Sequence, residues 1–351
     1  MPNQKRTVTT ILLAGVVALL VWQFSHSSEW KHFTWAAVWT ATRSARWEDI
    51  AGAVALIYLS YVIRVWRWQG LMSPPGRFGP IWRGTAIGFT GTSLLGRPAE
   101  LVRPYYIARK HQSKLAPQLA VWLLERTFDM AGVVLLVALD LALSPRLSAL
   151  TRQSAYQQAF HRAGMVLTVA IVVMVGGLYW FHLRSAGVLG LLHRRQQRHP
   201  HAWRQRLTHF LEMLAEGTAV LTKPRRLLAA VGWTVLLWLD VSGSIWLTVH
   251  AYPTMLPGFS FAAGVLLMGF TAVGAVLQLP AVGGGFQVLT VFGLTKFFGA
   301  ALAPATSAAL LTWLICFYAI APVGLGLAAH EGVSWRGIEH EAIQTELAEE
   351  A

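Results

Sequence analysis

The sequence contains only one cysteine, Cys316, and few charged residues. A single thiol excludes disulfide bonds within the chain. Only 13% of the 351 residues are charged, whereas 55% are hydrophobic. No polar segment is long enough for a soluble catalytic domain, and no nucleophile elbow, Walker loop, zinc motif or Rossmann fingerprint occurs in a suitable context. We therefore predict a protein that is not an enzyme and that has no cofactor and no metal site.

Long hydrophobic runs are abundant instead. A helix needs about 20 apolar residues to cross the roughly 30 Å hydrocarbon core of a bilayer. Six runs are predicted as spanning helices: 8–24, 50–69, 117–143, 163–183, 226–249 and 304–329. Glycine and proline interrupt two further runs, 81–96 and 258–299, which favours re-entrant helical hairpins. The sequence thus predicts an all-α integral membrane protein, with one polytopic transmembrane domain over 1–335 and an acidic C-terminal tail over 336–351.

Acidic residues are scarce relative to basic ones, since 16 Asp and Glu stand against 29 Lys and Arg. The basic residues flank hydrophobic runs, so they indicate membrane topology, and we predict no nucleic-acid partner. The segment 184–226 carries nine Lys or Arg and is predicted to be a cytoplasmic loop. Arg64 and Arg67 are assigned to the same side as part of this positive charge. We predict a bacterial inner-membrane protein with both termini in the cytoplasm.

Two parts of the chain, about 81–143 and 260–329, resemble each other. The matched tripeptides are Gly88-Phe89-Thr90 with Gly269-Phe270-Thr271, and Leu115-Ala116-Pro117 with Leu302-Ala303-Pro304. So short a match also arises by chance. If it is a true repeat, three predicted spans separate the two hairpins, and an odd number of crossings inverts the second copy. Inverted repeats with broken helices are typical of secondary transporters, whose site lies near the midplane.

The stretch "LLGRPAELVRPYYIARKH", residues 94–111, places several charges between hydrophobic runs. Gly96 is predicted to end one helix, and Pro98 suits the first turn of the next. Arg97, Glu100 and Arg103 are three residues apart and share one helical face. Pro104 is predicted to kink or stop the helix just after Arg103. An ordinary charged cytoplasmic helix is the alternative interpretation.

Three charged residues lie inside a predicted span. Glu125, Arg126 and Asp129 come 8 to 12 residues after its start, roughly 12–18 Å deep at 1.5 Å per residue. Each unpaired charge at the centre of a span costs about 2.5–3.5 kcal/mol, so these side chains must be paired or hydrated. The predicted partners are Arg97, Glu100 and Arg103. The alternative is a buried ion network with a structural role only.

The second interrupted run contains "LQLPAVGGGFQVLT". Gly283, Gly284 and Gly285 allow backbone N–H groups to approach an anion, although close helix packing explains them equally well. Gln287 is a candidate hydrogen-bond partner of a headgroup or of Glu100. Asp240 lies in the middle of a span and is either a further acid of the site or a partner of Ser242 and Ser244.

These motifs together resemble the lysylphosphatidylglycerol synthase transmembrane-region family. The matching residues are Gly96-Arg97-x-x-Glu100-x-x-Arg103, Glu125-Arg126-x-x-Asp129, and the element from Pro280 to Gln287. The resemblance covers about residues 10 to 330 and implies a helical bundle with re-entrant elements. It also implies lipid translocation and not aminoacyl transfer, because the family's cytosolic synthase domain is lacking. The family's glycine-rich element usually ends in glutamate, and Gln287 at that position argues against a cationic aminoacyl headgroup.

The leading hypothesis is a flippase that moves a phospholipid or a lipid-linked headgroup between leaflets. Its predicted partners are membrane lipids with an anionic or phosphate-bearing headgroup, and a homo-oligomer is compatible with the sequence. A membrane-embedded lipid-modifying transferase and a scaffold for envelope synthesis are the alternatives. The predicted substrate-binding residues are Arg97, Glu100, Arg103, Glu125, Arg126, Asp129, Gly283, Gly284, Gly285 and Gln287, with Asp240 as a further candidate.

Overall fold

The computed structural model describes residues 34–72, 74–143, 224–276, 278–279 and 283–332, together with isolated positions between 165 and 212. The regular structure in this part of the chain is helical apart from two two-residue antiparallel strands, β1 (Gln278–Leu279) and β2 (Gly283–Gly284). The predicted span at 8–24 and the predicted tail at 336–351 lie outside the described residues, as does nearly all of 163–183. The all-α prediction is confirmed for the described part.

The described helices lie in two stretches of the chain, one on each side of residues 144–223. They are α2 (Trp35–Arg43), α3 (Trp47–Leu71), α4 (Phe78–Leu95), the 3-10 helix η2 (Arg97–Leu101), α5 (Val102–His111), α6 (Leu115–Leu143), α10 (Pro224–His250), α11 (Phe261–Val276), α12 (Gly285–Phe292), α13 (Leu302–Trp313) and α14 (Ala321–His330). Two π-helical turns, η4 (Gly293–Phe297) and η5 (Leu314–Tyr318), follow α12 and α13.

Three of the described helices are long and apolar enough to cross a membrane: Trp47–Leu71, Arg225–His250 and Leu302–His330. They correspond to the predicted spans 50–69, 226–249 and 304–329. Helix α6 has 29 residues and matches the predicted span at 117–143, but it carries the charged group around Glu125. The chain is thus a helical membrane protein, while the full number of spans stays a prediction.

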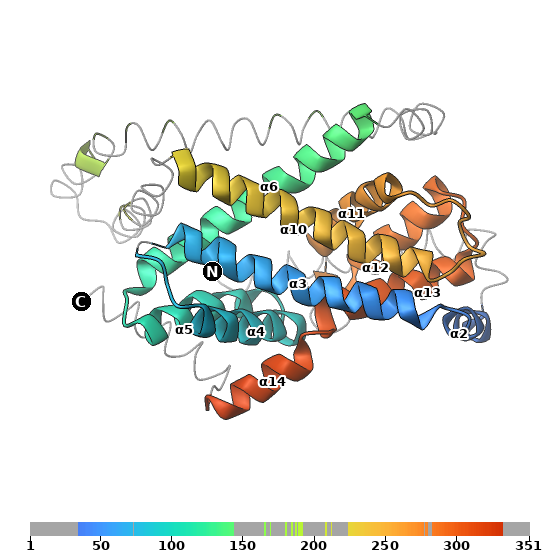
Figure 1. Ribbon diagram of the computed structural model, residues 1–351, viewed down its shortest axis with the longest axis horizontal. Helices are drawn as coiled ribbons and strands as arrows, with labels where there is room; N and C mark the ends of the chain where they lie inside the picture. Colours follow the sequence, from blue (N-terminus) through green and yellow to red (C-terminus); the bar gives the residue numbers. More distant parts are fainter. Residues whose placement is uncertain are drawn as a thin grey trace, which may run out of the picture.

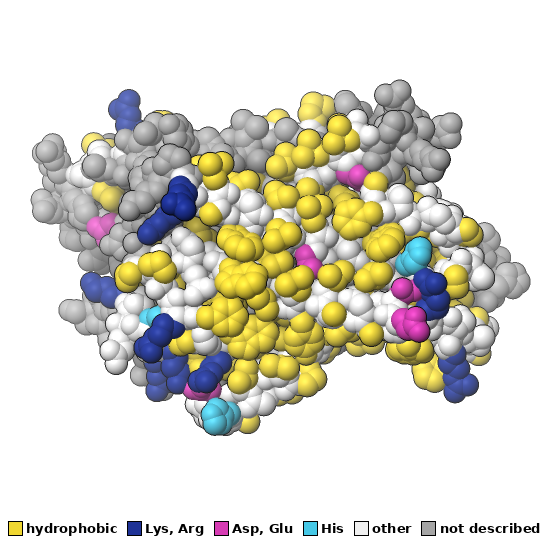
Figure 2. All heavy atoms as spheres, viewed as in Figure 1, with side chains coloured by type: hydrophobic (Ala, Val, Ile, Leu, Met, Phe, Trp, Pro, Cys, Tyr) yellow, Lys and Arg dark blue, Asp and Glu magenta, His cyan; other side chains and the backbone are white. Residues whose placement is uncertain are grey.

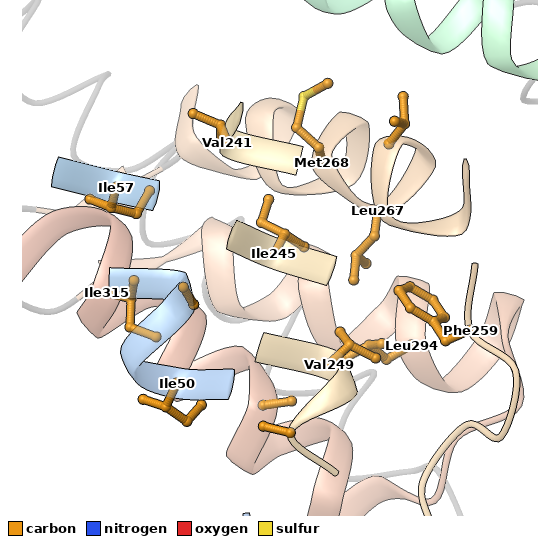
Figure 3. Packing of buried hydrophobic residues seen from close by; sticks show 14 of the residues in the cluster. Ile50, Ile57, Val241, Ile245, Val249, Phe259, Leu267, Met268, Leu294 and Ile315 are labelled. Carbon is orange, nitrogen blue, oxygen red and sulfur yellow. The ribbon is translucent and has the colours of Figure 1, made fainter. Parts of the chain in front are cut away.

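Helices α3 and α10 lie side by side and antiparallel through the centre of the molecule (Figure 1). The start of α3 meets the end of α10, where the N–H of Arg46 donates to the carbonyl of Ala251 at 2.8 Å. Val241, Ile245 and Val249 are spaced four residues apart, so they lie on one face of α10. Figure 3 shows this face packed among buried side chains of α3, α11 and η5. This packing holds the two central helices in a fixed register.

The same order of elements occurs twice in the described chain. A long helix, α4 or α11, ends at a break and is followed by a short helix, α5 or α12, and then by another long helix. Helix α6 begins at Leu115 and α13 begins at Leu302, the two leucines matched in the sequence comparison. In Figure 1, α4 and α5 lie toward the C-terminal end of α3, and α11 and α12 lie toward its N-terminal end.

The first break forms as the sequence predicts, with one correction. Gly96 ends α4 with φ at 88°, a conformation that glycine adopts without strain. Pro98 lies in the first turn of η2. The sequence predicts that Pro104 kinks or stops the helix just after Arg103, and a stop is wrong, because α5 runs from Val102 to His111. Pro104 is its third residue, and the first turn of a helix needs no backbone donor there.

Figure 2 shows hydrophobic side chains covering the middle of one face, while Lys and Arg gather toward the two ends of the molecule. Trp35, Trp39 and Trp47 are 68%, 58% and 59% exposed at one end. Exposed tryptophans that flank an apolar band are typical of the two membrane–water interfaces. The surface is therefore that of a protein embedded in a bilayer.

Candidate functional site

A buried ion cluster forms where α3, α5 and α6 meet. Glu125 and Asp129 are four residues apart on α6, so both carboxylates lie on one face. Arg67 of α3 bridges them: its Nη1 lies 2.7 Å from Asp129 Oδ1, and its Nη2 lies 3.2 Å from Glu125 Oε1. Thr234 of α10 accepts a further hydrogen bond from Arg67 Nη1 at 3.1 Å. One guanidinium thus joins α3, α6 and α10.

Arg103 of α5 contacts the carboxylate of Glu125 as well. It belongs to the first broken-helix segment, which comprises α4, η2 and α5. Arg103 Nη1 donates to Glu125 Oε2 at 2.7 Å. Its guanidinium lies 4.1 Å from the centroid of the Trp68 ring, a cation–π contact that replaces part of the lost hydration. The close approach of α4 to α5 makes this possible, because a Cβ at Gly88 would lie 2.7 Å from the Cβ of Arg103.

Two more arginines approach Asp129. Arg64 Nη1 lies 3.5 Å from Asp129 Oδ2, and Arg126 Nη2 lies 3.6 Å from the same oxygen. Trp238 Nε1 donates to the other oxygen, Oδ1, at 3.3 Å. The Arg64 guanidinium also lies 5.0 Å from the ring centroid of Phe89. Asp129 is consequently surrounded by donors from three helices.

The cluster has more positive than negative charge. Four arginines, at 64, 67, 103 and 126, contact two carboxylates, at 125 and 129, which leaves a formal charge of +2. Glu125 is fully buried, and Arg67 and Arg103 are only 1% and 3% exposed. Within the described chain, the buried Nε atoms of Arg64, Arg67 and Arg103 have no hydrogen-bond partner. Such a site favours an anion that accepts from several guanidinium groups.

The structure corrects the sequence interpretation of Arg64 and Arg67. The flanking pattern predicts that they belong to the positive charge of the cytoplasmic side, but both are buried in the cluster. A signal for this was available, because both arginines fall inside the hydrophobic run 50–69 and are three residues apart, on one helical face. Two acids inside one span required cations from another span, and α3 supplies them.

The sequence predicts that Arg97, Glu100 and Arg103 pair with the charged residues of α6, and the outcome differs among the three. Arg103 pairs with Glu125 as expected, whereas the side chain of Arg97 lies outside the described side chains. Glu100 is half-buried and takes part in none of the ion pairs of the described residues. With Arg103, Arg126 and Trp122 it lines a small cavity of about 30 Å³. The cavity has room for about one water molecule between α4, α5 and α6.

The second broken-helix segment comprises α11, β1, β2 and α12. One of its own side chains caps the start of α12. Gln287 Oε1 accepts from the N–H of Gly284 at 2.7 Å and so caps the start of α12. Gly283 and Gly284 form β2, and Gly285 begins α12. A Cβ at Gly274 of α11 would collide with the carbonyl oxygen of Gly285. The φ of Gly284 is 112°, which favours glycine at that position, and the predicted contacts of Gly283, Gly284 and Gly285 with a headgroup stay a prediction.

Asp240 lies on the central helix α10 and is only 8% exposed. The interpretation that pairs it with two serines is wrong, because those hydroxyls donate to backbone carbonyls. Ser242 Oγ donates to the carbonyl of Trp238 at 2.7 Å, and Ser244 Oγ donates to that of Ala53 at 2.9 Å. In the described part of the chain, the buried Oδ2 of Asp240 has no hydrogen-bond partner. Arg64 is close enough to interact with it electrostatically.

A second group of charges lies just after α14. Glu331 Oε1 accepts from Arg83 Nη1 of α4 at 2.7 Å, and Oε2 accepts from Lys110 Nζ of α5 at 2.5 Å. The hydrogen bond from Lys110 lowers the pKa of Glu331 below its ordinary value of 4.5. These ion pairs attach the end of α14 to the first broken-helix segment.

Among the described residues, no group of three or more His, Cys, Asp or Glu side chains is placed to hold a metal ion. The family described as lysylphosphatidylglycerol synthase TM region matches residues 9–324, a range that includes the whole ion cluster. No curated protein and no solved structure matches the chain.

Proposed function

The chain belongs to the lysylphosphatidylglycerol synthase transmembrane-region family, and from this premise we propose that it moves a phospholipid or a lipid-linked headgroup between the leaflets of a bilayer. The family and the three long apolar helices make it a membrane protein of lipid-related synthesis or transport. Transport is the more specific part of the proposal.

The observation that carries the proposal is the excess of arginine in the buried ion cluster. Four guanidinium groups and two carboxylates leave a formal charge of +2, with Arg64, Arg67 and Arg103 buried and Arg126 partly exposed. A phosphate group has the charge and the oxygen geometry to accept from two or more of these guanidinium groups. The small cavity beside Glu100, Arg103 and Arg126, of about 30 Å³, has room for about one water molecule, so we propose that the first broken-helix segment moves away from α6 when a headgroup binds there.

The duplicated order of elements supports a transport mechanism. We propose that the α4–α5 and α11–α12 segments are re-entrant hairpins of an inverted repeat. Each contains a break and a close glycine contact, at Gly88 in the first and at Gly274 in the second. Two such segments entering from opposite sides provide two related halves around one site, which is the basis of alternating access in many transporters.

The proposed location is the inner membrane of a bacterium, with both termini in the cytoplasm. The end of the molecule that contains the start of α10 then faces the cytoplasm. The basic segment 184–226 supports this orientation through the bias of Lys and Arg toward the cytoplasmic side. Helix α10 begins at Pro224, so Arg225 and Arg226 belong to that helix and not to the loop.

The substitution Glu100→Ala tests the proposal. Purified wild-type and variant chains are reconstituted into vesicles that contain fluorescent phosphatidylglycerol, and dithionite reports which leaflet the label occupies. We expect Glu100→Ala to abolish translocation while its thermal unfolding stays close to wild type, because Glu100 is half-buried and takes part in none of the described ion pairs.

Glu48→Ala is the matched control. Glu48 is an exposed acid in the first turn of α3, whereas the arginines that α3 contributes to the ion cluster lie near its other end. The control variant should translocate lipid at the wild-type rate. Unchanged transport in Glu100→Ala would refute the role of the cavity. A covalently altered lipid in the same vesicles would favour the transferase alternative, and full function in cells after removal of the buried charges would favour a scaffold.

A further inference from the structure

A second cavity, of about 300 Å³, lies where the end of α3 meets the start of α10. Its charged lining consists of Arg67 from α3 and of Arg225 and Arg226 from α10. No acidic side chain is among the described residues that line it. The remaining walls are small or apolar and include Ala229 and Trp233. The cavity therefore combines three positive charges with an apolar surface.

Arg67 gives this cavity a buried donor. The side chain is 1% exposed, and its two Nη atoms face Asp129 and Glu125. In the described part of the chain, its buried Nε has no hydrogen-bond partner. An unsatisfied donor of a buried cation is costly, and Arg67 is one of the residues that line the cavity.

The apolar part of the lining distinguishes the kind of anion. Trp233 is held by Trp66, whose ring centroid lies 5.4 Å away. Together with Ala229 and Ala230, Trp233 gives the cavity an apolar wall. A free ion makes no favourable contact with such a wall, whereas the glycerol part of a lipid would pack against it. The volume is at the lower end of the range of about 300–1,000 Å³ for ligand pockets, which suits a headgroup with its chains outside.

The two cavities are joined by one chain of ion pairs. Arg67 borders the larger cavity and contacts Glu125, which accepts from Arg103 at 2.7 Å. Arg103 in turn borders the smaller cavity beside Glu100. Glu125 thus separates two groups of arginines, one at each cavity.

We propose that the larger cavity binds the phosphate of an anionic lipid headgroup, as an entry site next to the buried ion cluster. This inference rests on the lipid-transport function proposed above and adds a binding site to it. Arg225 and Arg226 attract the phosphate, Arg67 receives it at the inner end, and Trp233 packs against the glycerol part of the lipid.

The test measures binding to the full chain in detergent by native mass spectrometry. The probes are dioctanoyl phosphatidylglycerol, its phosphate-free analogue dioctanoylglycerol, and inorganic phosphate as a competitor. The double variant Arg225→Gln/Arg226→Gln removes two cavity charges. The matched control Arg109→Gln/Lys114→Gln removes two charges of the same sign from α5 and from the connection that follows it, outside the cavity lining.

We expect the Arg225→Gln/Arg226→Gln variant to bind phosphatidylglycerol about 10- to 100-fold more weakly than wild type, since two charge-assisted contacts are lost. The control should stay within about twofold, because neither Arg109 nor Lys114 lines the cavity. Binding of dioctanoylglycerol should not change between the variants. Ala229→Phe keeps the charges but fills the cavity, so it should weaken binding of phosphatidylglycerol as well.

Equal weakening in the double variant and in its control would overturn the proposal, as would full binding in Ala229→Phe. Displacement of the lipid by inorganic phosphate at matching concentrations would also overturn it, because the ligand would then be the free ion. Vesicle transport is measured separately. A wild-type chain that binds at the cavity but does not translocate lipid refutes the proposed function, whereas transport without cavity binding refutes only the entry site.

Discussion

Replacing Glu125 by glutamine removes one negative charge from the centre of the buried ion cluster and keeps the shape of the side chain. Glu125 is fully buried and holds Arg103 at 2.7 Å and Arg67 at 3.2 Å. Arg67 keeps Asp129, 2.7 Å away, in the variant. Arg103 has no second carboxylate among its described ion pairs. The substitution therefore leaves one buried arginine without a counter-charge and weakens the pairing of another.

Breaking a buried ion pair by removing one partner costs about 3–5 kcal/mol. We expect Glu125→Gln to lower the free energy of unfolding by about this amount, which is a large part of the roughly 5–15 kcal/mol that stabilises a typical domain. Arg126→Gln is the comparison. Arg126 is 35% exposed and lies 3.6 Å from Asp129, so its loss should cost only about 0–1 kcal/mol.

The assay is reversible unfolding in mixed detergent micelles, followed by circular dichroism. A double-mutant cycle with Arg103→Gln isolates the pair, and we expect a coupling energy of about 0.5–3 kcal/mol. The reasoning is refuted if Glu125→Gln and Arg126→Gln destabilise the protein equally. It is also refuted if the double variant loses the sum of the two single losses.

Three further predictions concern other parts of the molecule. Gly88→Ala should destabilise the protein by about 1–3 kcal/mol and slow translocation, because the new Cβ would overlap Arg103. Gly79→Ala in the same helix is the control: its Cβ meets open space, so neither stability nor translocation should change. Gln287→Ala should cost about 0.5–2 kcal/mol in the same unfolding assay by removing the cap of α12. Ion pairing lowers the pKa of Glu331, so the stability it contributes is present above its ordinary value of 4.5 and is lost as pH falls below that value. Unfolding measured between pH 7 and pH 3 should therefore show a steeper acid loss for wild type than for Glu331→Gln.

The sequence contained enough information for the local structure. Runs of apolar residues predicted α3, α6, α10 and the helical stretch from Leu302 to His330 within a few residues. Gly96 marked the end of α4 because glycine readily adopts a positive φ. These features depend on neighbours in the chain, so they can be inferred from sequence. The error at Pro104 was also local, since the structure places this residue inside the first turn of α5.

The sequence also predicted that charged residues lie deep in a membrane span, but it did not predict which residues they contact. The position of Glu125 and Asp129 inside a span showed that they need cationic partners. Only the tertiary structure identified these as Arg67 and Arg64 of α3 in addition to Arg103. Arg67 is 62 positions away from Asp129 in the sequence, and nothing in the local pattern states which helices pack together.

The sequence by itself determined that this is a helical membrane protein with costly charges at depth, because hydrophobic length and helical spacing are properties of continuous segments. The tertiary structure decided which charges meet, that arginines outnumber carboxylates in the cluster, and that a cavity lies between the end of α3 and the start of α10. The physical reason is that ion pairing and cavities depend on the packing of distant helices. Their energies are fixed by distances of a few ångströms that no single segment contains.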